Sequence, residues 1–193
     1  MKKISLITML LFSVAFSQLR VGLDLSRSAK SSISVPAEMK AAFLAAGEEV
    51  PGSQDLTAGG LGLNVGYELM LLSLIGVGAE ANLGIANKEC DEEDDKCYEP
   101  DNQYFGYGVV KFPVFPMVRA VIKGGLVMSS DSNVDAGLGL GFGVRVKPPI
   151  LPIGVEASYN IYDLSLKEEH EGLGNIEKDF RQTYFNISAT YSF

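Results

Sequence analysis

The sequence has few basic residues, no tryptophan and no long hydrophobic run beyond its first 16 residues. Its 193 residues include 16 Lys and Arg against 24 Asp and Glu, which gives a net charge of −8 at neutral pH. A chain this acidic repels the phosphate backbone, so nucleic acid is not an expected partner. Because none of its apolar runs, including the one at residues 4–16, is long enough for a membrane helix, it could cross a bilayer only as a closed barrel.

Histidine and cysteine are also scarce. The single histidine, His170, lies among charged residues, where nothing in the sequence fixes a neighbour for acid–base or nucleophilic chemistry. Cys90 and Cys97 share one polar segment, so a local disulfide is the expectation for an exported chain. A zinc site would lack further ligands, and the acidic run at residues 91–95 lacks the spacing and glycine of an EF-hand. We therefore expect no cofactor, no metal and no enzyme activity.

The first residues have the pattern of a secretory signal peptide. Lys2 and Lys3 precede an apolar stretch at residues 4–16, and Ala15 stands two positions before Ser17. This pattern predicts cleavage between Ser17 and Gln18, with a signal peptide at residues 1–17 and one mature domain at residues 18–193. Removal of the two lysines would leave 14 basic and 24 acidic residues, a charge near −10.

The last segment, residues 182–193, alternates between two faces along its whole length. One face carries, besides Thr183, the residues Phe185, Ile187, Ala189, Tyr191 and Phe193, and the other face is polar. A period of two predicts a β-strand. The same period predicts seven earlier strands, at residues 19–26, 60–69, 75–85, 103–112, 118–126, 136–146 and 153–162. The register of the fourth is ambiguous, because both of its faces are apolar until Lys111.

The connections between these strands alternate between long and short. Long or polar segments are expected at residues 27–56, 88–101, 129–133 and 165–179, and short turns near residues 70–73, 113–116 and 147–152. Within the first long segment, Pro36, Glu38 and Gly47 mark the start and end of a short helix whose Met39 and Phe43 share a face. We interpret this helix as packed on the barrel rim, with a lid or membrane-surface element as the alternative.

The polar face of the strands is poor in charge and rich in Gly, Ser and Asn. Its charges could balance as Glu68, Glu80 and Glu156 against Arg119, Lys123, Arg145 and, less firmly, Lys111. A solvent-exposed face would hold more Lys and Glu, whereas the narrow interior of a small barrel requires paired charges. These features favour polar residues inside and apolar residues outside, over a soluble barrel with the opposite arrangement.

The chain resembles the small eight-stranded outer-membrane barrels of the OmpA/OmpX type, the family called outer membrane protein β-barrel. The resemblance is carried by the alternating last strand, by the alternation of long and short connections, and by strands such as Gly-Val-Gly-Ala-Glu80 and Val-Glu156-Ala-Ser-Tyr159. It implies an all-β, antiparallel, up-and-down transmembrane barrel in the bacterial outer membrane. It also implies contact with outer-membrane lipid and insertion by the barrel-assembly machinery, with Phe185, Ile187, Ala189, Tyr191 and Phe193 as the recognised signal.

The family does not define one activity. We expect a non-catalytic, monomeric barrel with a structural role in the envelope or a surface-interaction role through its extracellular loops, whose partner the sequence does not identify. A small-solute channel is the alternative, because the inward glycines at residues 137–143 could leave a narrow lumen. Packing of these glycines against large inward residues such as Tyr162 and Tyr184 is the favoured interpretation. A lipid-modifying enzyme and a soluble periplasmic ligand-binding barrel are weaker alternatives.

Overall fold

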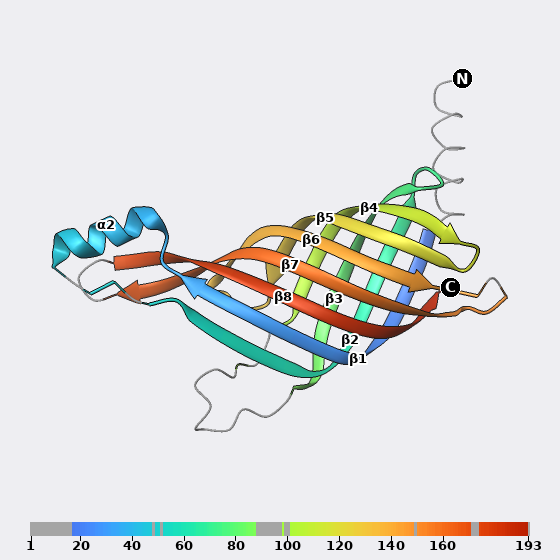
Figure 1. Ribbon diagram of the computed structural model, residues 1–193, viewed down its shortest axis with the longest axis horizontal. Helices are drawn as coiled ribbons and strands as arrows, with labels where there is room; N and C mark the ends of the chain where they lie inside the picture. Colours follow the sequence, from blue (N-terminus) through green and yellow to red (C-terminus); the bar gives the residue numbers. More distant parts are fainter. Residues whose placement is uncertain are drawn as a thin grey trace, which may run out of the picture.

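The protein is a closed antiparallel barrel of eight strands, seen here in a computed structural model (Figure 1). The structure describes residues 17–47, 49–50, 52–87, 98, 101–148, 150–170 and 174–192. Each strand pairs with its neighbours in the chain, and β1 also pairs with β8 to close the ring. The elements are β1 Ser17–Ser34, α2 Ala37–Ala46, β2 Gln54–Met70, β3 Ile75–Asn87, β4 Gln103–Phe115, β5 Val118–Ser129, β6 Val134–Val146, β7 Ile153–His170 and β8 Gly174–Ser192. The predicted all-β, eight-stranded fold is confirmed.

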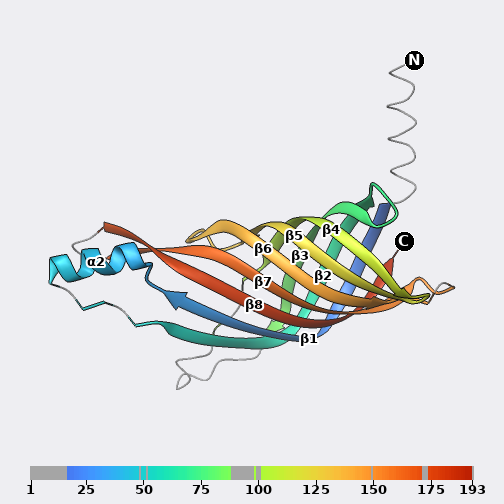
Figure 2. The ribbon, with the colours of Figure 1, turned by 45° about the horizontal axis from the view of Figure 1, so that its top comes forward.

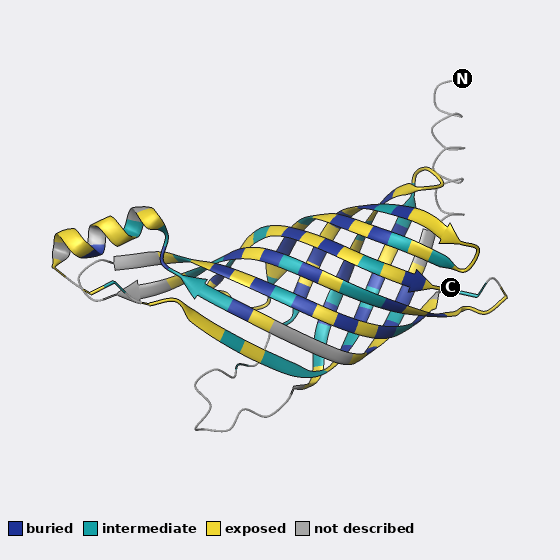
Figure 3. Cartoon of the chain, viewed as in Figure 1, coloured by how far each residue is buried: buried dark blue, intermediate teal, exposed yellow. Residues whose placement is uncertain are grey.

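Alternation along each strand separates an outer from an inner surface, which appears as a checkerboard of exposed and buried residues (Figure 3). The exposed members are mostly large and apolar, such as Leu140, Phe142 and Ile153. The buried members include many polar and charged side chains. The barrel therefore has an apolar exterior and a polar interior, the arrangement expected of a barrel surrounded by lipid.

The structure shows which residues of β4 face inward, which the sequence left ambiguous. Gln103, Phe105, Tyr107, Val109 and Lys111 are buried inside, while the alternate residues face outward. The strand is apolar on both faces because it contributes large side chains to the interior as well as to the outer surface. It therefore supplies both a charged residue and aromatic packing to the lumen.

All eight strands are longer than the sequence predicts, and β1, β2, β7 and β8 extend far into the predicted loops. The pairing of β1 with β2 and with β8 runs up to Ile33 and Ser34, and that of β7 with β8 runs to His170 and Gly174. The predicted loops at residues 27–56 and 165–179 are therefore wrong at their edges, because backbone pairing continues through polar residues. In Figures 1 and 2, β2, β1, β8 and β7 project beyond the other strands as one sheet, which we call the sheet extension.

The predicted helix is present at the far end of this extension. It ends at Gly47, which adopts the left-handed conformation (φ 77°) that glycine tolerates best. Phe43 is fully buried against Val35, with Met39 and Val50 beside them. This cluster lies within residues 35–50, so the helix packs on its own loop rather than on the barrel rim. Among the described residues, no helix is long and apolar enough to cross a membrane.

Three short connections lie together at the opposite end (Figures 1 and 2). They are residues 71–74 between β2 and β3, Pro116 and Met117 between β4 and β5, and residues 147–152 between β6 and β7. The second turn is tighter than predicted, because Pro113 remains in β4 opposite Arg119 and the register shifts before Phe115. The first predicted turn, which has no glycine or proline, is closed by bonds from the Leu71 and Leu72 amides to the Ile75 carbonyl.

Candidate functional site

The barrel interior is the part of the molecule where polar side chains converge. Among the described residues, eight charged side chains are buried there, four acidic and four basic: Asp24, Glu68, Glu80 and Glu156, with Arg20, Lys111, Lys123 and Arg145. Their formal charges sum to zero. This balance is what a narrow lumen requires, since an unpaired charge removed from water is costly.

Arg20 of β1 lies at the centre of this charge network. Its Nη1 donates to Glu156 Oε2 at 2.6 Å and its Nη2 to Glu80 Oε2 at 2.9 Å. The same Nη1 also lies 3.6 Å from Glu68 Oε1. One guanidinium therefore joins carboxylates from β2, β3 and β7 across the lumen, which its planar fork of donors allows.

A second group of contacts continues the network toward the short turns. Arg145 Nη1 and Nη2 contact Glu68 at 3.1 and 3.2 Å, and Arg145 Nε donates to Glu156 Oε2 at 2.8 Å. Lys111 Nζ also donates to Glu68, and the Tyr107 hydroxyl donates to Glu68 Oε1 at 3.1 Å. Glu68 therefore accepts from three different side chains at once, which satisfies both of its oxygens.

The fourth basic partner, Lys123, closes the network on the β5 side. Its Nζ donates to Glu80 Oε2 at 2.7 Å and lies 3.6 Å from Glu156 Oε1. The same ammonium lies 4.9 Å from the centre of the Tyr107 ring, within the range of a cation–π contact. Charge and aromatic packing therefore meet at this point.

The structure brings together five of the six predicted interior charges: Glu68, Glu80, Lys123, Arg145 and Glu156. The placement of Arg119 inside was wrong. Arg119 shares the inward register of β5, but it lies next to a short turn at the end of the strand, where its side chain is exposed.

Sequence reasoning also missed Arg20 and Asp24 as members of the network. Both belong to the polar set that alternates with Leu19, Val21 and Leu23, so counting charges on that strand would have found them. Lys111, only weakly predicted, is buried in the network as well.

Amide side chains form a layer next to the charges. Asn64 Nδ2 donates to Asn82 Oδ1 at 2.5 Å, and Gln103 Nε2 donates to Gln182 Oε1 at 3.0 Å. A cavity of about 10 Å³ lies between this layer and Arg20, Glu80 and Lys123. That volume is about the size of one water molecule, so the described lumen offers no continuous aqueous path at this level.

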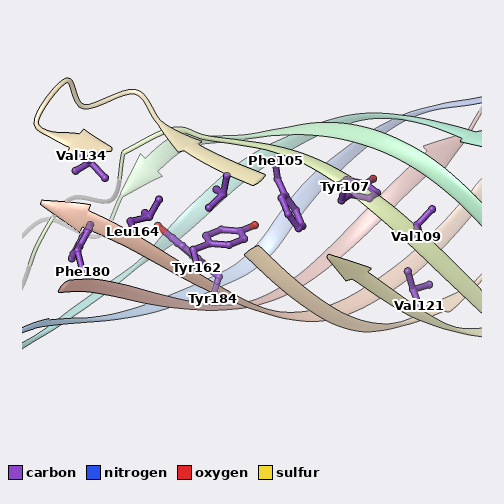
Figure 4. Close-up of a cluster of buried hydrophobic side chains, with 10 residues drawn as sticks. Phe105, Tyr107, Val109, Val121, Val134, Tyr162, Leu164, Phe180 and Tyr184 are labelled. Atoms are coloured by element: carbon purple, nitrogen blue, oxygen red, sulfur yellow. The ribbon is translucent and has the colours of Figure 1, made fainter. Parts of the chain in front are cut away.

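Aromatic side chains also fill the lumen (Figure 4). The ring centre of Phe105 lies 5.0 Å from that of Tyr107 and 5.5 Å from that of Tyr162, and the Tyr162 ring lies 5.5 Å from that of Tyr184. A Cβ at Gly139 would meet the Phe105 ring at 2.7 Å and the Tyr162 ring at 3.1 Å. Glycine at this position therefore makes room for the aromatic rings, as the packing interpretation predicts for Tyr162.

The end of the barrel opposite the short turns carries charged residues, among them two exposed pairs within the described residues. Arg181 Nε donates to Asp163 Oδ1 at 2.5 Å, and this bond raises the pKa of Arg181. Lys167 lies 2.7 Å from Asp135 Oδ2, and the pKa of Lys167 is likewise raised by its hydrogen bond to Asp135. Asp101, before β4, is half-buried near Asp131, and burial and then the neighbouring charge raise its pKa.

Several residues that the sequence singled out do not take part in a site within the described residues. His170 ends β7, paired through its backbone with Gly174, and so does not lie in a loop as predicted. Cys90, Cys97, Phe193, residues 1–16 and the acidic run at residues 91–95 lie outside the described residues. Ser17 begins β1 and Gln18 follows it. Within the described ranges, no group of three or more His, Cys, Asp or Glu side chains could hold a metal ion.

These features define a class of protein: a small barrel that spans a membrane with an apolar exterior and a filled, charge-paired interior. The model of the family described as "Outer membrane protein beta-barrel domain" matches residues 13–193, and the chain belongs to this family. It is therefore an integral protein of the bacterial outer membrane.

Several solved structures are similar to this chain. Ail, the attachment invasion locus protein of Yersinia pestis, is 13% identical, with a TM-score of 0.43, over 92% of this chain and 99% of Ail. Neisserial surface protein A is 14% identical, with a TM-score of 0.46, over 91% of this chain and 97% of the other. The outer membrane protein AlkL is 12% identical, with a TM-score of 0.46, over 92% and 90%. No curated protein sequence matches the chain.

Proposed function

We propose that this protein is a non-catalytic outer-membrane anchor whose closed barrel displays a surface-interaction element outside the cell. The observation that carries this proposal is the filled lumen. The charge network around Arg20, the amide side chains and the aromatic cluster pack against one another inside the barrel. A barrel packed in this way has a structural interior, so its contacts with other molecules are made from its ends.

The sheet extension supplies the surface that such a role needs. It carries an exposed polar hollow of about 410 Å³, lined in part by Ser32, Ser34, Asp163, Asp179 and Arg181. Its charges are mixed, since Arg181 pairs with Asp163 while Asp179 lies nearby. Helix α2 adds exposed side chains at its tip, including Leu44, which is 71% exposed. This chemistry suits a polar macromolecular surface with some apolar contact.

The alternative of a small-solute channel has less support. Neighbouring side chains fill the space beside the inward glycines that suggested a lumen. A Cβ at Gly141 would lie 2.5 Å from Asn160 Oδ1, and one at Gly139 would meet Phe105. Opening a path through the lumen would require breaking ion pairs and separating packed aromatic rings at the same time.

We propose further that the barrel-assembly machinery inserts the chain by recognising its last strand, where Phe185, Ile187 and Tyr191 lie exposed on the outer surface.

The proposal is tested by separating the barrel from its tip. In cells lacking the native gene, we would express the full protein or a variant in which residues 35–53 are replaced by a short Gly-Ser turn. Both should reach the outer membrane and show the compact band of a folded barrel on an unboiled gel. A surface-interaction role predicts that adherence of the cells to surfaces and to one another is lost with the tip. Adherence that never depends on the protein, together with envelope integrity restored equally by both forms, would instead support a purely structural role.

A further inference from the structure

The end of the barrel that carries the short turns is unusually apolar. Eight large apolar side chains are exposed there, and we call them the apolar rim: Leu71, Leu72, Leu74, Val114, Phe115, Met117, Ile150 and Leu151. Ile150 is 92% exposed and Phe115 is 67% exposed. All three short connections contribute, so the rim encircles this end rather than forming one patch. Exposed apolar surface of this extent marks a contact with another apolar phase.

The length of the outer apolar surface indicates what that phase is. On β7, outward apolar residues run from Ile153 to Ile161, and the next outward residue is Asp163, paired with Arg181. Eight residue steps at ~3.3 Å each, tilted by ~40°, span only ~20 Å along the barrel axis. The apolar band of an outer-membrane barrel is ~25 Å tall. The remaining height of the apolar band cannot lie beyond the charged Asp163, so the apolar rim must supply it.

The same shortfall occurs on β8 and β2, but not on β6, whose outward residues from Ala136 to Val146 are all apolar. The outward apolar residues of β2 run from Leu61 to Leu69, and those of β8 from Phe185 to Tyr191 before the charge of Arg181 is reached. The two turns that border this side of the barrel, residues 71–74 and 147–152, expose Leu71, Leu72, Leu74, Ile150 and Leu151. The rim therefore continues the lipid-facing surface past the ends of these strands.

The exposed and half-buried charges that the structure describes at this end have one sign. Among the described residues, the charged side chains outside the buried network here are Arg119, which is exposed, and Lys147, which is half-buried. Neither forms an ion pair with another described residue. The chain as a whole is strongly acidic, at −8, so this local basic character is the opposite of the average. Apolar side chains flanked by basic ones are the chemistry of a membrane interface that contains anionic lipid.

We infer that the apolar rim inserts into the inner leaflet of the outer membrane, with Arg119 and Lys147 contacting the headgroups of anionic phospholipids. The short turns then lie in the lipid interface instead of projecting into the periplasm. This inference does not depend on what the extracellular elements bind. It concerns how deeply the barrel sits and which lipids surround its lower end.

The absence of tryptophan makes a direct test available, because a single introduced Trp is an unambiguous reporter. Ile150→Trp and Leu72→Trp, each reconstituted in vesicles, should emit at shorter wavelength than Trp in water. Both should be quenched by lipids brominated on their acyl chains and protected from acrylamide. Leu140→Trp, on the outer face of β6, is the positive control for lipid contact, and Ser130→Trp, in an exposed turn at the other end, is the control for water.

A lipid-specific arm tests the basic side chains. A spin-labelled anionic lipid should quench Ile150→Trp more strongly than its zwitterionic counterpart does. Adding Arg119→Gln and Lys147→Gln should abolish that preference, whereas Lys30→Gln on the outward face of β1 should leave it unchanged. An equal response to both lipids in the parent would refute the anionic part of the inference.

Two outcomes would overturn the inference as a whole. In the first, Ile150→Trp and Leu72→Trp respond as Ser130→Trp does, with full access to acrylamide. In the second, both are protected from acrylamide but are not quenched by brominated lipid, and cross-linking yields a dimer, which would assign the rim to a second copy of the chain.

Discussion

Arg20 and Glu156 are 136 positions apart in the chain, yet Arg20 Nη1 donates to Glu156 Oε2 at 2.6 Å inside the barrel. They come from β1 and β7, which are separated in the ring by β8. The contact can form only after the ring has closed, because β1 reaches its position by pairing with β8. Closure of the barrel and formation of the charge network are therefore linked.

We predict that Arg20→Met strongly destabilises the folded barrel. The substitution keeps the bulk of the side chain but leaves Glu80 and Glu156 short of a buried partner, which typically costs ~3–5 kcal/mol. The free energy of unfolding, measured by urea titration in lipid vesicles, should fall by about that amount. Arg119→Met is the matched control: this arginine is exposed, so its loss should change the stability by less than ~1 kcal/mol.

A double substitution separates the ion pair from side-chain packing. Arg20→Met combined with Glu156→Leu removes one acidic and one basic charge, so the interior stays neutral. If the two residues act through their charges, the double variant should lose less stability than the sum of the two single variants. Strict additivity would show that the 2.6 Å contact contributes nothing of its own.

Gly78→Val should destabilise the barrel through its interior. A Cβ at Gly78 would lie 2.8 Å from the Tyr107 ring, which lies under Lys123 and whose hydroxyl donates to Glu68. Overpacking at such a position typically costs ~1–3 kcal/mol. Gly106→Val is the control, since a Cβ there meets nothing within 4 Å. The temperature at which the compact band is lost on a gel should fall for Gly78→Val alone, and equal shifts in both variants would contradict the packing account.

The contact between the chain before β4 and the turn after β5 should weaken as the pH rises. Burial and the nearby Asp131 raise the pKa of Asp101 above its ordinary value of 3.8. The folded state therefore binds a proton more tightly than the unfolded state, so stability is fully present below pH 3.8 and declines as the pH rises through the raised pKa. The nearby reporter is the Ser130 amide, which donates to the Asn102 carbonyl at 2.9 Å.

Hydrogen exchange measures this effect. After correction for the intrinsic dependence of exchange on pH, the Ser130 amide should be better protected in acid than at neutral pH. Asp101→Asn should remove the difference by raising the protection at neutral pH. If the variant and the parent keep the same pH dependence, Asp101 is not the group responsible.

Much of the fold could be predicted because lipid and a narrow lumen impose opposite chemistry on alternate residues. Phe185, Ile187 and Tyr191 identify the last strand in this way, and Glu68, Glu80 and Glu156 identify the inner face. The strand ends could not be predicted, because beyond the membrane both faces are polar. Residues such as Ser28, Lys30 and Ser32 keep their backbone pairing with β8 without any apolar alternation.

The sequence predicts that paired charges lie inside the barrel, but it does not predict correctly which charged residues these are. Alternation assigns a residue to a face, but it does not say where along the axis the strand leaves the barrel. Arg119 has the inward register and is still exposed, because it lies at the end of the lumen. Arg20 also faces inward, on β1, but it is buried in the lumen, where it contacts Glu80 and Glu156. Depth along the axis depends on the strand stagger, which is a property of the closed ring.

The central claim, that the barrel is a closed anchor, is tested most directly by single-channel conductance. Protein that shows the compact band of a folded barrel would be inserted into a planar bilayer and recorded over a range of voltages of both signs. The account predicts no steady current steps above the bilayer baseline, because ion pairs, amides and aromatic rings fill the lumen. Stable, ohmic steps from the unaltered protein would contradict it and would favour the small-solute channel.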